Sequence, residues 1–215
     1  MANYNWRGFQ HQPWLSRFPD GVRGLSAWRQ LSFLEGPPAR LIEERQRTTT
    51  RPARPCVFVS HRQADVAPAT RIAYLACLEG FDYWLDILDP MLSGMPGVGW
   101  GGPSAQQSSV AVAAIIEMAL LNSTHVIAVM TANTQGSQWV PYEYGRVKDP
   151  LPVTPQAACW VDGAIAGSQL PEYLYLGAIT RTESEIRNWL QTERQQYWGV
   201  GAGGCKWMEP VPSSI

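Results

Sequence analysis

Residues 137–143, Ser-Gln-Trp-Val-Pro-Tyr-Glu, bring an aromatic side chain and a carboxylate together in one short stretch. An apolar run at 126–130, typical of a buried strand, precedes them, and Ser137 is suited to cap a helix that begins there. On such a helix Trp139 and Glu143 lie four residues apart and share one face. Ligands of α/β sheets usually bind at the carboxyl ends of the strands, so this face predicts a site for a flat ligand that is cationic or carries a sugar. The alternative is an amphipathic helix with a core Trp and a solvated Glu.

The composition predicts a chain with a substantial core. Of the 215 residues, 45% are hydrophobic and 16% are charged, and the net charge is -1 at pH 7. These values argue against a disordered chain and give no reason to expect a nucleic acid or an acidic membrane surface as partner. No apolar run reaches the roughly 20 residues of a membrane span. The scattered cysteines, Cys56, Cys77, Cys159 and Cys205, predict unpaired thiols and a cytoplasmic protein.

The chain divides into three segments by composition. Residues 1–54 are rich in Trp, Arg and Pro, and we expect a partly helical N-terminal extension that packs on the main domain or on a second subunit. Residues 55–196 alternate strand and helix patterns, with strands expected at 56–60, 81–86, 124–130, 157–161 and 173–176. Residues 197–215 are rich in Gly and Pro and are expected to be irregular. The alternation predicts an α/β domain whose parallel sheet is covered by helices on both faces.

Several common site motifs are absent or misplaced. Two stretches, 97–102 and 199–204, match the glycine spacing of a dinucleotide fingerprint, but neither joins a predicted strand directly to a helix. The sequence contains no phosphate-binding loop motif and no G-x-S-x-G nucleophile elbow. Its three histidines are isolated from one another and from cysteines, so we expect no metal site.

With the strands assigned, residues 55–196 resemble a TIR (Toll/interleukin-1 receptor) domain, most closely the bacterial ones. The resemblance depends on four stretches in family-like order: 57–61 (Val-Phe-Val-Ser-His), 79–86 (Glu-Gly-Phe-Asp-Tyr-Trp-Leu-Asp), 116–131, and 137–139 leading to Glu143. It implies a flavodoxin-like fold with five parallel strands and helices on both faces. The loop at 87–107 is longer and richer in glycine than is usual for the family, and Pro141 inside the last motif is also atypical.

In enzymatic TIR domains the Glu of this motif is catalytic, and the reaction cleaves the nicotinamide–ribose bond of NAD+. The resemblance therefore implies that Glu143 is the catalytic residue, with NAD+ as substrate and neither a prosthetic group nor a metal. It implies a nucleotide-binding role for six further residues: Ser60, His61, Arg62, Trp84, Asp86 and Trp139. The family also implies a homo-oligomer, because contacts between TIR domains complete the site.

This chemistry suits a single carboxylate. The leaving group departs as neutral nicotinamide from a pyridinium, so no general acid is required, and the transition state carries positive charge on the ribose. A well-placed carboxylate stabilises that charge. Water as acceptor gives ADP-ribose, an atom of the same molecule gives a cyclic isomer, and another base gives an exchanged dinucleotide.

Three functions remain open from the sequence. The first is an NAD+ glycohydrolase or cyclase of a bacterial anti-phage system such as Thoeris, whose nucleotide product signals to a separate effector. The second is a non-catalytic TIR module that only assembles with other TIR domains. The third is another nucleotide-handling enzyme with a flavodoxin-like fold, such as a nucleoside deoxyribosyltransferase, which needs a carboxylate nucleophile close to the sugar carbon.

Overall fold

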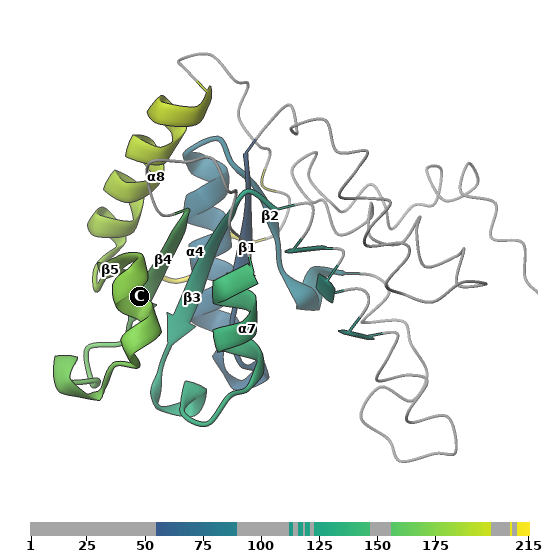
Figure 1. Cartoon of the computed structure of the whole chain (residues 1–215). Helices are drawn as coiled ribbons and strands as arrows, with labels where there is room; N and C mark the ends of the chain where they lie inside the picture. Colours follow the sequence, from purple (N-terminus) through teal and green to yellow (C-terminus); the bar gives the residue numbers. More distant parts are fainter. Residues whose placement is uncertain are drawn as a thin grey trace, which may run out of the picture.

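A five-stranded parallel sheet organises the part of the chain that the structure describes. The computed structural model describes residues 55–89, 112–113, 116–117, 119–120, 123–146, 156–198, 207 and 210–215. The strands are β1 (Cys56–Ser60), β2 (Asp82–Trp84), β3 (His125–Met130), β4 (Ala157–Val161) and β5 (Ala178–Thr180). All four strand pairings are parallel, in the order β2-β1-β3-β4-β5 (Figure 1). This is the order of flavodoxin-like folds, and it confirms the predicted α/β class and all-parallel sheet.

Helices cover both faces of this sheet. The α-helices are α4 (Val66–Leu78), α7 (Trp139–Arg146) and α8 (Glu183–Trp198). The described residues between 112 and 120 are also helical. Short 3₁₀ helices occupy several connections: η2 (Gln63–Asp65), η3 (Asp86–Leu88), η4 (Ala132–Thr134), η5 (Gly167–Gln169) and η6 (Glu172–Leu176).

Alternating strand residues build two hydrophobic layers, one on each face. Every residue of β1, β3 and β4 is buried, which explains their almost continuous apolar sequences. The layer under α4 and α8 contains Val57, Val59, Ile127, Val129, Ala158 and Trp160. The layer under α7 contains Phe58, Val126, Ala128, Met130, Ala157, Cys159 and Val161.

The predicted position of the fifth strand is wrong. The sequence 173–176 alternates Tyr and Leu like a strand, but it forms η6, and the strand follows at Ala178–Thr180. Within η6 Leu174 is fully buried, while Tyr175 and Leu176 are more than 60% exposed, so the apolar alternation does not correspond to a buried face. Gly177 separates the two elements and lies so close to the Ala157 carbonyl that a Cβ would clash at 2.4 Å.

Local residues explain the end of α4 and the start of α8, but not the start of α4. Gly80 ends α4 with a φ of +85°, and the Thr182 hydroxyl and Glu185 carboxylate form a capping box at the start of α8. Asp65 precedes α4 but makes no side-chain cap. Its carboxylate instead accepts hydrogen bonds from Thr131 and Asn133 in the connection after β3. These tertiary donors compete with the backbone amides at the start of α4.

The expectation for the cysteines is only partly met. Cys56 and Cys159 are buried thiols outside any disulfide, but Cys77 is disulfide-bonded, which contradicts the prediction of four unpaired thiols. Sequence spacing did not reveal this bond, since it depends on tertiary proximity. Among the described helices, none combines the length and apolarity needed to cross a bilayer. The predicted extension at 1–54 and most of the 87–107 loop lie outside the described residues.

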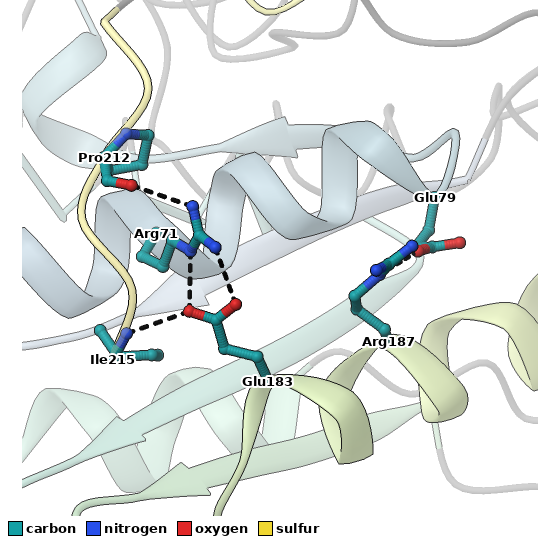
Figure 2. Close-up of polar contacts among 6 residues, drawn as sticks. All are labelled: Arg71, Glu79, Glu183, Arg187, Pro212 and Ile215. Carbon is teal, nitrogen blue, oxygen red and sulfur yellow. Dashed lines mark hydrogen bonds and ion pairs between the residues drawn. The ribbon is translucent and has the colours of Figure 1, made fainter.

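Trp207 and residues 210–215 lie along the helical layer formed by α4 and α8. Trp207 packs against Tyr74 and Tyr83, with ring centroids 5.4 and 5.2 Å away. Figure 2 shows the polar contacts: Arg71 on α4 makes two 2.8 Å bonds to Glu183 on α8, and its third donor bonds to the Pro212 carbonyl. These contacts join α4, α8 and the last described residues of the chain into one layer.

Candidate functional site

The site predicted from the sequence lies at the carboxyl end of β1, where the direction of the chain connections reverses. Strand β1 pairs with β2 on one side and with β3 on the other, so the connections that leave β1 and β2 cross opposite faces of the sheet. Such a switch point is the usual ligand position in an open α/β sheet. Ser60 ends β1, and α7, which carries Glu143, follows β3.

Glu143 and Ser60 are joined directly, although 83 residues separate them in the sequence. The Ser60 hydroxyl donates a 2.5 Å hydrogen bond to Oε2 of Glu143. Ser60 is fully buried and Glu143 is 6% exposed. Oε1 of Glu143 has no hydrogen-bond partner among the described residues, and none of them forms an ion pair with this carboxylate. A buried carboxylate without a cationic partner is costly for a fold, which marks this position as a candidate for function.

Burial raises the pKa of Glu143 from 4.5 to about 7. The hydrogen bond from Ser60 favours the charged form and lowers the pKa, while the nearby negative charge of Asp86 raises it. The burial effect is the largest of the three. A carboxyl group with this pKa exists in both protonation states near neutral pH, as a tuned active-site acid often does.

Asp86 and His61 form a second pair at the same end of the sheet. His61 Nε2 lies 3.3 Å from Oδ1 of Asp86, and the side chains are 2% and 38% exposed. Oδ1 of Asp86 also accepts a 2.6 Å bond from the Ile87 backbone amide. Thus three of the predicted site residues, Ser60, Asp86 and Glu143, lie close together at this edge of the sheet. His61 lies next to Asp86.

A buried network fixes the loops around this site. Asp65, which is 4% exposed, accepts hydrogen bonds from the Thr131 hydroxyl at 2.9 Å and from the Asn133 amide at 2.8 Å. Thr131 and Thr134 also form a capping box at η4. These bonds join the connection after β1 to the connection after β3. The sequence gives only a weak sign of this network, the polar run at 131–134, because the bonded residues lie more than 60 positions apart.

Helix α7 is held in place by Glu117, whose role no sequence motif indicated. Its carboxylate accepts bonds from Arg146, with Nε at 2.8 Å and Nη2 at 2.5 Å, and from the Tyr142 hydroxyl. Val140 is fully buried beneath the helix, and its amide donates to the Ser137 hydroxyl at 3.3 Å. Ser137 therefore caps α7, as the sequence predicted.

The three remaining predicted residues make no hydrogen bond or ion pair with Ser60, Asp86 or Glu143 in the part of the chain that the structure describes. Trp84 is 2% exposed, stacks on Phe58 at 4.6 Å and donates to Asp89, so it belongs to the core. Trp139 is 45% exposed and contacts Tyr142 edge-on. Arg62 is exposed, with no hydrogen-bond or ion-pair partner for its side chain among the described residues.

A cavity of about 100 Å³ lies at the same end of the sheet, but on the other side of α7. Its wall includes Met130, Ser137, Pro141 and Tyr173. Pro141 precedes Glu143 by two residues, which places the two side chains about 200° apart around the helix. The cavity is well below the roughly 300 Å³ of ordinary ligand pockets, and we assign it no ligand. The described residues contain no cluster of three or more His, Cys, Asp or Glu side chains that could hold a metal.

Comparisons with protein-family models, with curated proteins and with solved structures find no match to this chain.

Proposed function

We propose that this chain is a TIR-type enzyme that cleaves the nicotinamide–ribose bond of NAD+. The observation that supports the proposal is the Glu143 carboxylate, buried and bonded to Ser60 at the switch point of a flavodoxin-like sheet. No described side chain neutralises this carboxylate, so its charge is available to a ligand that carries or develops a positive charge.

Glu143 would act electrostatically. As neutral nicotinamide leaves, positive charge spreads over the ribose, and a fixed carboxylate stabilises that charge more than it stabilises the ground state. Ser60 holds Oε2, which leaves Oε1 to face the sugar. On this proposal the product is ADP-ribose or a cyclic isomer, which signals to a separate effector in bacterial anti-phage defence, and TIR contacts between copies complete the site.

The decisive experiment incubates the full-length protein with NAD+ and analyses the products by liquid chromatography and mass spectrometry. We expect nicotinamide from the wild type, and a loss on the order of 10²-fold or more in Glu143→Gln. Glu183→Gln is the matched control, because it changes a carboxylate on the opposite face of the sheet and should retain activity. Nicotinamide release that is unaffected by Glu143→Gln would refute the assignment.

Two other functions are tested by the same preparation. If concentrated protein leaves NAD+ intact, also after addition of an extract from infected cells, a non-catalytic TIR module becomes the better proposal. A deoxyribosyltransferase would form a covalent bond between Glu143 and the sugar, so mass spectrometry would detect a peptide containing Glu143 that is labelled by a fluorinated sugar analogue.

A further inference from the structure

The pairing between β1 and β3 ends where the site begins. The last paired position is Ser60 opposite Ala128, and beyond it the two strands lead into separate connections. One connection leads into α4, and the other passes through η4 into α7, which carries Glu143. The hydrogen bond between Ser60 and Glu143 joins the end of β1 to α7. Its geometry therefore depends on how the two connections are held relative to each other.

Asp65 joins these two connections through hydrogen bonds to both of its carboxylate oxygens. It is the last residue of η2, and 4% of it is exposed. Oδ2 accepts the Thr131 hydroxyl at 2.9 Å, and Oδ1 accepts the Asn133 side-chain amide at 2.8 Å. The Asp65 backbone amide donates to the Arg62 carbonyl at 2.7 Å, which closes the turn after β1. The side chain thus holds the connection after β3, while the backbone holds the connection after β1.

From Thr131 the hydrogen bonds continue to the start of α7. The Thr131 amide donates to the Thr134 hydroxyl at 3.0 Å. The Thr134 carbonyl accepts the Ser137 amide at 3.1 Å, and the Ser137 hydroxyl accepts the Val140 amide in the first turn of α7. A series of hydrogen bonds therefore connects Asp65 to the helix that carries the catalytic carboxylate.

Stability alone does not account for the burial of Asp65. Its hydrogen-bond donors are a hydroxyl and an amide, it forms no ion pair with any residue that the structure describes, and it does not cap α4. A buried carboxylate without a cation is costly. Glu79, at the other end of α4, is also buried but accepts the Arg187 guanidinium at 2.6 Å and the Gln191 amide at 2.9 Å. What Asp65 contributes is the fixed placement of the two connections.

We propose that Asp65 is a positioning residue, which aligns Ser60 with Glu143 by holding η4 and the start of α7 against the connection after β1. The inference rests on the proposed function for its kinetic consequence, because the carboxylate must face the ribose to stabilise its positive charge. The charge that raises the pKa of Glu143 comes from Asp86, so Asp65 acts through the position of the connections and not through its own charge.

Steady-state kinetics of NAD+ cleavage by the full-length protein test this role. Asp65→Ala removes both acceptors, and we expect kcat to fall about tenfold while KM changes by less than about twofold. Asp65→Asn keeps an oxygen for the Asn133 amide and turns a donor toward the Thr131 hydroxyl, so it should recover most of the loss. Glu79→Gln is the matched control, because it alters a buried carboxylate at the other end of α4, and it should leave kcat unchanged. Equal losses in Asp65→Ala and Glu79→Gln, or no recovery in Asp65→Asn, would overturn the inference.

Asn133→Ala keeps the test decisive if Asp65→Ala does not fold. The Asn133 side chain is exposed, so its truncation removes one of the two bonds to Asp65 at little cost to folding. We expect this variant to lower kcat about threefold, again with little change in KM. An unchanged kcat would show that the bond does not position the site.

A measurement without substrate separates this inference from the proposed function. The side-chain carboxyl of Glu143 is titrated by carbon-13 NMR, with Glu143→Gln to assign its signal. Val140 is fully buried and keeps α7 packed on the sheet, so Asp65→Ala should weaken the Ser60 hydrogen bond without hydrating Glu143. Because that hydrogen bond lowers the pKa of Glu143, the titration midpoint should rise. In a Ser60→Ala background, Asp65→Ala should raise it no further.

The two proposals can then fail separately. If Asp65→Ala does not raise the Glu143 midpoint, or raises it equally with and without the Ser60 hydroxyl, the positioning role is wrong, even in an active enzyme. If the midpoint rises only when Ser60 is present while none of the variants nor the wild type cleaves NAD+, the positioning role stands and the proposed reaction is wrong.

Discussion

Glu143 and Glu183 lie on opposite faces of one sheet, and their hydrogen-bond partners differ: Glu183 has a cationic partner and Glu143 has only a hydroxyl. Glu183 receives two hydrogen bonds from Arg71 and one from the Ile215 amide (Figure 2), and the bond from Arg71 holds its pKa below the ordinary value. Glu143 receives one hydroxyl bond from Ser60, and burial raises its pKa to about 7. The first arrangement stabilises the fold, and the second does so only when the group is protonated.

The difference identifies Glu143 as a position where a buried charge lowers the stability of the fold. A carboxylate that joins two helices needs a cation, and α4 supplies Arg71. A carboxylate that meets a cationic ligand needs its charge uncompensated until the ligand arrives, so the fold bears the cost of burial. The predictions below test this contrast, beginning with the largest expected effect.

Glu143→Gln should reduce NAD+ cleavage on the order of 10²-fold while stabilising the fold at alkaline pH. The pKa of Glu143 is about 7 in the folded protein and 4.5 in the unfolded chain, so its contribution to stability is present below pH 4.5 and is lost as the pH rises through 7. The variant avoids this loss, and urea unfolding should give it an advantage of up to about 3 kcal/mol at pH 8 and none near pH 4. A variant that is less stable than the wild type at pH 8 would contradict this account.

Ser60→Ala should move the pH dependence of the site upward. The Ser60 hydrogen bond lowers the pKa of Glu143, so removing it raises that pKa and shifts the pH of half-maximal activity to higher values. The pH profile of kcat/KM measures this shift. Ser137→Ala is the control, because the Ser137 hydroxyl bonds to the Val140 amide instead of the carboxylate, and it should leave the midpoint unchanged. A downward shift in Ser60→Ala would contradict the proposed role of the hydroxyl.

The fold was easier to predict than the site because the two depend on different ranges of the chain. Strands β1, β3 and β4 are buried on both faces, so their apolar runs are visible in the sequence. Strand β5 is only three residues long and partly exposed, which left no comparable pattern and led to the misplaced prediction at 173–176.

Within the site, spacing predicted that Trp139 and Glu143 share a face of α7, yet one is 45% exposed and the other is buried. Positions four apart differ by about 40° around a helix, and Trp139 is the first residue of α7, at the periphery of the core. The bond between Ser60 and Glu143 joins two elements that are distant in the chain, and only the resemblance to a family placed both residues at one site.

Glu183→Gln should have the opposite effect on stability to Glu143→Gln, and a smaller one. The Arg71 and Glu183 side chains are 15% and 22% exposed, so solvent screens their attraction and we expect a loss of about 1 kcal/mol at pH 7. Because the pKa of Glu183 is lowered in the folded protein, its contribution is present above the unfolded pKa and is lost as the pH falls through the lowered folded pKa. Urea unfolding at pH 7 and pH 3 measures the difference. A deficit that persists at pH 3 would show that the contact stabilises through packing instead of charge.

Trp139→Ala should be the mildest of these changes in stability and the most informative about the ligand. Trp139 is 45% exposed and contacts Tyr142 edge-on, so its removal should cost only about 0.5 kcal/mol. If this indole covers the bound dinucleotide, the variant should raise KM for NAD+ several-fold with little change in kcat, because a stacking contact made equally in ground and transition states affects binding alone. Tyr175→Ala is the matched control, since it removes an aromatic that is 61% exposed on η6. Equal KM values for both variants and the wild type would remove Trp139 from the site and leave Glu143, Ser60 and Asp86 as its core.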